Sequence, residues 1–103
     1  MSLSMQVVYP VTEDTHFNFD YYLGTHMPLV GEKMGAHIAS TLVTRGIGGG
    51  APDAPAPFYA VATMVFDDQA QMDSALANSS EVIADIANFT NSQPQFLVGE
   101  VVG

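Results

Sequence analysis

The segment FNFDYYLGTHMPLV, residues 17–30, carries a histidine and a tyrosine at a spacing that could support acid–base chemistry. His26 follows Tyr22 by four residues, so on an α-helix the two side chains lie on neighbouring turns of one face. An imidazole can take up or release a proton near neutral pH, and a phenol can stabilise an oxygen that gains negative charge. We therefore predict His26 and Tyr22 as catalytic residues. The simpler alternative is a buried histidine that only satisfies its hydrogen bonds beside a packing aromatic ring.

The apolar pattern of this segment predicts which side of the helix faces a sheet. At about 100° of rotation per residue, His26 lies within roughly 20° of Phe19. The same face carries Leu23, Val30 and Met34. The opposite side, expected to face solvent, carries Tyr21, Thr25, Pro28 and Glu32. Pro28 has no amide proton and crowds the carbonyl of Gly24, so we expect a helix distortion around His26 and a locally polar pocket.

Composition excludes several classes of function. Of the 103 residues 48% are hydrophobic and only 13% charged, and the net charge is −9 with Lys33 and Arg45 as the only basic side chains besides histidine. Nucleic acids and anionic membranes are therefore not expected as partners. The scarcity of charge suggests that a second chain covers part of the surface. Without cysteine, thiol catalysis and cysteine-ligated metals are excluded. The three histidines lack a metal-binding spacing, and no metal or cofactor is expected. We read a cytoplasmic protein with a single domain over residues 5–103, residues 1–4 being an expression remnant or a disordered end.

The order of predicted elements indicates an α+β fold. Strands are expected at residues 5–11, 37–46, 58–66 and 95–102, and helices at 18–34 and at 67–89, the latter in two pieces. Residues 46–57, GIGGGAPDAPAP, form a long connection that could be mobile or act as a lid. This βαββαβ order gives a ferredoxin-like, four-stranded antiparallel sheet with both helical units on one face. Because the strands read as apolar on both faces, we predict a homodimer whose two sheets meet face to face.

The motif Phe19-x-x-Tyr22-x-x-x-His26-x-Pro28-Leu29 resembles the signature of the EthD-like family, as do DIANFT at 85–90 and the final GEVV. The resemblance implies a dimeric α+β barrel with a cavity between each sheet and its helices. It also implies a small protein of oxidative degradation or polyketide chemistry that works without a cofactor. It assigns site roles to His26 and Tyr22, and to Asp85 and Asn88.

Three functions remain open from the sequence. The first is an enzyme with monooxygenase-like, isomerase-like or lyase-like acid–base chemistry on a small hydrophobic carbonyl or phenolic compound. The second is a binding or accessory protein that holds such a compound for a partner oxidase. The third is a structural dimerisation module with a filled core. In the first two, the residues predicted to contact the ligand are Phe19, Leu23, Met64, Phe66, Asp85, Asn88 and Phe89.

Overall fold

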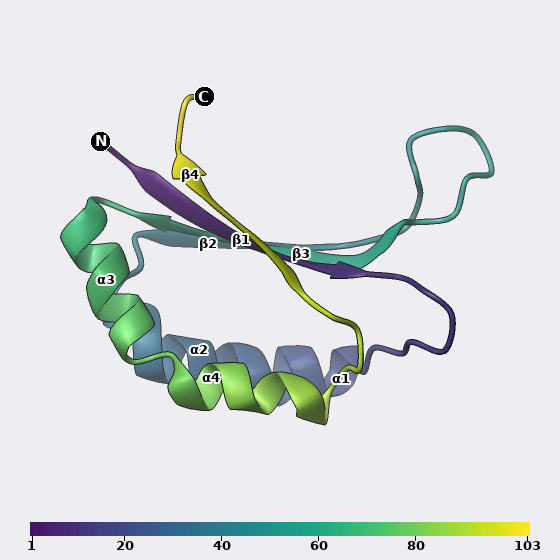
Figure 1. Cartoon of the computed structure of the whole chain (residues 1–103), viewed down its shortest axis with the longest axis horizontal. Helices are drawn as coiled ribbons and strands as arrows, with labels where there is room; N and C mark the ends of the chain where they lie inside the picture. Colours follow the sequence, from purple (N-terminus) through teal and green to yellow (C-terminus); the bar gives the residue numbers. More distant parts are fainter.

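The computed structural model describes residues 1–103, and it contains one antiparallel sheet with helices packed against one of its faces (Figure 1). The strands are β1 (Leu3–Pro10), β2 (Ser40–Arg45), β3 (Phe58–Phe66) and β4 (Gln95–Glu100). Their spatial order is β2-β3-β1-β4, and every neighbouring pair is antiparallel. The predicted ferredoxin-like βαββαβ arrangement is therefore confirmed.

Two helical units connect the strands and lie side by side beneath the sheet (Figure 1). The first unit consists of α1 (Phe19–Tyr21), a π-helical turn (Tyr22–His26), α2 (Met27–Met34) and a 3-10 turn (Gly35–His37). The second consists of α3 (Gln69–Ala77), α4 (Ser80–Asp85) and a 3-10 turn (Ile86–Asn88). Both units begin as predicted, because the side chains of Asn18 and Asp68 accept hydrogen bonds from backbone amides of the first turn.

Strict alternation along the two central strands builds the core. Met5, Val7 and Tyr9 of β1 are buried on the helical side, as are the alternate residues of β3 from Ala60 to Phe66. Their neighbours along each strand point to the opposite face. The largest fully buried side chains are those of Tyr9, Tyr22, Phe66 and Phe89.

Three predicted strand boundaries are wrong by two residues or more, one of them the end of β4, which lies at Glu100 and not at residue 102. The first strand begins at Leu3, inside the segment expected to be a remnant or disordered, because Leu3 pairs with Phe66 on one side and Glu100 on the other. The second strand begins at Ser40 and not at residue 37. His37 instead closes a 3-10 turn, where its Nδ1 hydrogen-bonds Oε1 of Gln71 at 2.9 Å.

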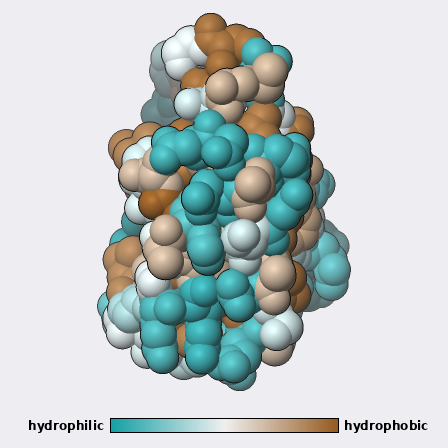
Figure 2. Space-filling model, turned by 90° about the vertical axis from the view of Figure 1, so that its left-hand side faces the viewer, coloured by the Kyte–Doolittle hydropathy of each residue, from teal (hydrophilic) through white to brown (hydrophobic).

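The sheet face opposite the helices is mixed in character and not uniformly apolar. On this face Gln6 donates a hydrogen bond to the Thr63 hydroxyl at 3.1 Å. Leu42 and Leu97 are 67% and 60% exposed there. The expectation of two apolar faces is therefore only partly right. By contrast, polar side chains cover most of the helical layer, which forms the lower half of the view in Figure 2.

The connection between β2 and β3 extends away from the helices as a long loop (Figure 1). It contains two residues with positive φ, Asp53 and Gly50. None of residues 46–57 lines the large cavity described below. The suggestion that this connection is a lid is therefore not supported.

Candidate active site

The helix around His26 is distorted where the sequence predicted. Because Pro28 has no amide proton, the α-helical hydrogen bond to the Gly24 carbonyl cannot form. The chain responds with a π-helical turn, in which the amide of Met27 donates to the carbonyl of Tyr22. Such turns are rare and occur often at functional sites.

The wider turn changes which side chains point inward. Tyr22 and His26 are both buried, at 1% and 3% exposure, as predicted. Leu23, however, is 57% exposed and does not line the cavity described below. Tyr21 was expected to face solvent, but it is half-buried and contacts the second helical unit. A regular 100° wheel does not hold through a π-helical turn, and this explains why Leu23 and Tyr21 face other directions than the wheel predicts.

Asp85, at the end of α4, fixes the orientation of the His26 ring. Nδ1 of His26 lies 3.0 Å from Oδ2 of Asp85. The other carboxylate oxygen accepts hydrogen bonds from the Tyr21 hydroxyl at 2.6 Å and from the Asn88 amide at 2.9 Å. Since an ionised carboxylate can only accept, the proton of neutral His26 sits on Nδ1. Nε2 then carries the lone pair and can act as a base.

The electrostatics of this network favour neutral His26 and ionised Asp85. Burial lowers the pKa of His26 from its ordinary value, and Asp85 opposes this shift only in part. Burial would raise the pKa of Asp85, but the hydrogen bonds from Tyr21, Asn88 and His26 outweigh it and lower that pKa. The hydrogen bond to Asp85, followed by burial, raises the pKa of Tyr21. At neutral pH the imidazole is therefore an uncharged base held by a carboxylate.

Tyr22 stacks against His26 but makes no hydrogen bond. The two ring centroids are 5.5 Å apart and the rings are inclined by 18°. The hydroxyl of Tyr22 is buried without a partner. Burial raises the pKa of Tyr22 to about 12, so this hydroxyl stays protonated. A buried hydroxyl without a partner costs about 1–3 kcal/mol of stability, which makes its presence here a feature to explain.

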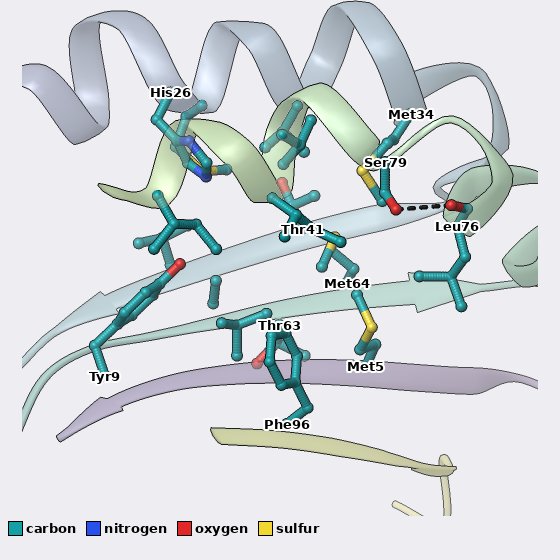
Figure 3. A pocket seen from close by; sticks show the side chains of 18 of the residues that line it. Met5, Tyr9, His26, Met34, Thr41, Thr63, Met64, Leu76, Ser79 and Phe96 are labelled. Carbon is teal, nitrogen blue, oxygen red and sulfur yellow. Dashed lines mark hydrogen bonds between the residues drawn. The ribbon is translucent and has the colours of Figure 1, made fainter. Parts of the chain in front are cut away.

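A cavity of about 340 Å³ lies between the sheet and the helices. Its size is at the lower end of small-molecule sites, which span about 300–1,000 Å³. Figure 3 shows the imidazole of His26 directed into it from the helix, with the thioethers of Met34 and Met64 farther along the cavity. Its mouth has an apolar rim of partly exposed side chains from the second helical unit and β4: Leu76, Ile83, Phe96 and Val98.

The cavity gathers some of the predicted site residues and leaves others outside. His26, Tyr22 and Met64 line it. The predicted residues that do not line it are Phe19, Leu23, Phe66, Asp85, Asn88 and Phe89. Asp85 and Asn88 act on His26 from behind, and the Phe89 ring packs 4.6 Å from the His26 ring.

Phe66 and Phe19 have other roles. Phe66 is wholly buried in the core, at 0% exposure. The guanidinium of Arg45 lies over the Phe19 ring, and 4.2 Å separates its central carbon from the ring centroid.

Sequence reasoning missed two tyrosines of the site. Tyr9 lines the cavity from β1, and Tyr21 supports Asp85. The alternation Met5, Val7, Tyr9 was a usable signal for the first, because it places Tyr9 on the same face as two core residues. No sequence signal pointed to Tyr21, since its position depends on the π-helical turn.

The chain offers little for a metal ion or a membrane. No three side chains among its histidines, aspartates and glutamates come close enough together to hold a metal. None of its helices has the length and apolar character needed to span a bilayer.

Comparison with known proteins identifies relatives over almost the whole chain. The EthD domain family matches residues 12–93. The structure of an EthD-like protein from Ralstonia eutropha JMP134 is 33% identical, with a TM-score of 0.89, and the match covers 99% of this chain and 93% of that one. No curated protein matches the sequence.

Two more distant structures share the fold. An ethyl tert-butyl ether D (EthD) family protein from Bacillus halodurans C-125 is 21% identical with a TM-score of 0.66, covering 99% of this chain and 100% of that one. SnoaB, a cofactor-independent oxygenase from Streptomyces nogalater, is 10% identical with a TM-score of 0.61, covering 98% and 95%. At these identities the likeness concerns the fold alone.

Proposed function

This chain belongs to the EthD family, and we propose that it binds a small hydrophobic carbonyl or phenolic compound and moves a proton on it by means of His26. The observation that carries the proposal is the hydrogen bond from Nδ1 of His26 to Asp85. It leaves Nε2 as a base on a side chain that lines a largely apolar cavity. General base catalysis needs such an imidazole, which is fixed in orientation and whose tautomer is set by a partner.

The proposed chemistry is removal of one proton from the ligand. Nε2 of His26 takes a proton from a carbon next to a carbonyl group, or from a phenol, and becomes positively charged. Asp85 stabilises that positive charge from the other side of the ring. The electron pair left on the ligand moves onto its oxygen, which becomes an enolate or phenolate. Tyr22, stacked on His26, has a hydroxyl without a partner that can turn toward that oxygen.

Such an anion is a common starting point for isomerisation, cyclisation, cleavage and oxygenation without a cofactor. The oxygenase reading gains support from the shared fold of SnoaB, which is described as a cofactor-independent oxygenase. Proton removal is the step that all of these reactions share, so it is the step to test first.

The test uses 2-tetralone, a flat bicyclic ketone with acidic hydrogens next to its carbonyl. Wild-type protein in deuterium oxide is expected to accelerate loss of these hydrogens from the proton NMR spectrum. His26→Gln should slow the exchange about 100-fold, because general base catalysis contributes roughly 10²–10⁴-fold. His37→Gln is the matched control, since His37 bonds Gln71 outside the cavity. Equal exchange by wild type and H26Q, with unchanged melting temperatures, would contradict the proposal.

A binding role without catalysis is the second candidate, and the apolar rim of the cavity mouth favours it. It predicts that 2-tetralone raises the melting temperature of wild type and of H26Q alike, with no exchange by either. The third reading, a filled structural core, requires side chains where the cavity of about 340 Å³ lies, and it is not supported.

The proposed functional unit is a homodimer that buries the sheet face opposite the helices. The exposed leucines of β2 and β4, Leu42 and Leu97, support this proposal. Leu42→Lys places a charge in that interface, and light scattering should then report the mass of a single chain. A wild-type mass of one chain at micromolar concentration would refute the dimer.

A further inference from the structure

Tyr9 is a second polar group that faces His26 across the cavity. Figure 3 shows its ring rising from β1 with the hydroxyl directed toward His26, which descends from the helix above. The residue is 2% exposed and belongs to the cavity wall. Its hydroxyl makes no hydrogen bond within the chain, and its ring is held by edge contacts with Phe17 and Phe89.

The two residues mark one polar end of a largely apolar chamber, whose other polar side chains are Thr41, Thr63 and Ser79. Tyr9 comes from the sheet and His26 from the π-helical turn, and the Tyr22 ring lies 6.1 Å from the ring of Tyr9. Away from these residues the wall is made mainly of aliphatic and methionine side chains, including Val30, Met34 and Val98. A ligand with an apolar body and oxygen at one end would match this division.

We propose that Tyr9 is a specificity-determining residue, whose hydroxyl donates a hydrogen bond to the ligand oxygen that carries the negative charge after His26 has removed the proton. The proposal rests on the proposed function and narrows its substrate class to neutral phenols and enolisable ketones. The proton of the ligand passes to Nε2 of His26. The electron pair that it leaves behind is held on the ligand oxygen that accepts the hydrogen bond from Tyr9.

The protonation state of Tyr9 is consistent with this role. Burial, followed by the nearby Tyr22, raises the pKa of Tyr9 far above its ordinary value of 10.0. The hydroxyl therefore remains a donor throughout the physiological range. It can stabilise an enolate or phenolate without giving up its own proton.

The cavity also disfavours substrates that are charged before the reaction. Neither Lys33 nor Arg45 lines it, and the chain as a whole carries a net charge of −9. A carboxylate or phosphate ligand would lose its hydration without meeting a cation, which disfavours its binding. A neutral phenol or ketone avoids that cost.

The experiment compares 2-naphthol with naphthalene, two ligands of nearly the same shape that differ by one hydroxyl. Wild type should bind 2-naphthol more tightly in calorimetric or fluorescence titrations. Tyr9→Phe should weaken 2-naphthol binding roughly three- to tenfold, as expected for one hydrogen bond, and leave naphthalene binding unchanged. Tyr59→Phe is the matched control. The Tyr59 hydroxyl forms a hydrogen bond with the Thr15 hydroxyl, and Tyr59 is not part of the cavity wall.

The outcomes separate this inference from the proposed function. If Y9F keeps the wild-type preference for 2-naphthol, or loses affinity for both ligands equally, Tyr9 has no oxygen-specific role and the inference is overturned. If Y9F also exchanges 2-tetralone at the wild-type rate, the proposed proton removal by His26 stands without a role for Tyr9. If wild type binds neither ligand, the cavity is not a ligand site and both proposals fail.

Discussion

The His26 ring divides two environments that treat polar groups in opposite ways. On the Nδ1 side, Asp85 accepts hydrogen bonds from His26, Tyr21 and Asn88 within 3.0 Å. On the cavity side, the Tyr22 hydroxyl is buried with no partner at all. The two sides also differ in burial, because Tyr21 and Asp85 are half-buried and Asn88 is exposed, whereas Tyr22 is 1% exposed. The unsatisfied hydroxyl therefore lies on the side where leaving it unpaired is most costly.

The contrast indicates that the two sides of the His26 ring have different roles. A protein that needed His26 only for stability would satisfy the polar groups on both sides, because an unpaired buried hydroxyl is costly. Here one side orients the ring and fixes its tautomer, and the other side keeps hydrogen-bonding capacity unused. Unused capacity in an apolar cavity is what a ligand with one or two oxygen atoms would exploit.

The largest expected effect comes from removing the charge on the satisfied side. Asp85→Asn can present its amide hydrogens to Nδ1, which would move the imidazole proton to Nε2 and block the base. We expect 2-tetralone exchange to fall by up to about 100-fold, approaching the loss in H26Q, because the base is blocked in both variants. Because Asp85 holds the pKa of His26 up against burial, any residual activity should show its acid limb at lower pH than in wild type.

Asp73→Asn is the control for that variant. Asp73 accepts a hydrogen bond from Gln69 on the exposed surface of α3 and has no contact with His26. Rate and pH profile should match those of wild type. A D85N protein that folds and exchanges at the wild-type rate would show that the orientation of His26 does not matter for proton removal.

Stability should depend on pH through the same residue. The pKa of His26 is lowered in the folded protein, so as the pH falls through 6.5 the unfolded chain takes up this proton first. The free energy of unfolding should therefore decrease below about pH 6.5, and the contribution of His26 is lost completely only below its folded pKa. Urea denaturation at pH 7.5, 6.5 and 5.5 measures this, and H26Q should show a smaller decrease. An identical decrease in H26Q would contradict the assignment.

The fold was predictable because its main determinants are local. Alternation from Ala60 to Phe66, the caps at Asn18 and Asp68, and the order of elements are all readable along the chain. The boundary at Leu3 was not, because that residue joins the strand through partners on β3 and β4 that are distant in sequence.

The site was predictable in part, for a related reason. His26 and Tyr22 are neighbours on one segment, and the effect of Pro28 on the helix could be anticipated. The roles of Asp85 and Tyr21 depend on how the two helical units meet, with the hydrogen-bonded partners 59 and 64 residues apart. The exposure of Leu23 depends on the exact form of the distortion, which proline alone does not specify.

A smaller and opposite effect is expected on the unsatisfied side. Tyr22→Phe removes a buried hydroxyl that has no partner and keeps the aromatic packing with Phe17 and Phe89. The variant should be more stable than wild type by about 1 kcal/mol. This corresponds to a rise in melting temperature of about 4–8 °C for a domain of this size. A clear loss of stability would mean that the hydroxyl has a partner in solution, such as an ordered water molecule.

The smallest expected effect concerns Tyr21, which acts on His26 only through Asp85. Tyr21→Phe removes the 2.6 Å hydrogen bond to Oδ1, while Asn88 and His26 still hold the carboxylate. The pKa of Asp85 should rise toward its ordinary value. Exchange of 2-tetralone should slow by less than roughly tenfold, which is the change expected for one hydrogen bond. Tyr21→Phe should therefore shift the acid limb of the rate profile only slightly, whereas a loss as large as that of D85N would mean that Tyr21 itself takes part in proton removal.

Measuring Y21F and Y22F side by side compares two tyrosines that are adjacent in sequence, one on the satisfied side of His26 and the other on the cavity side. Only the second should gain stability from losing its hydroxyl.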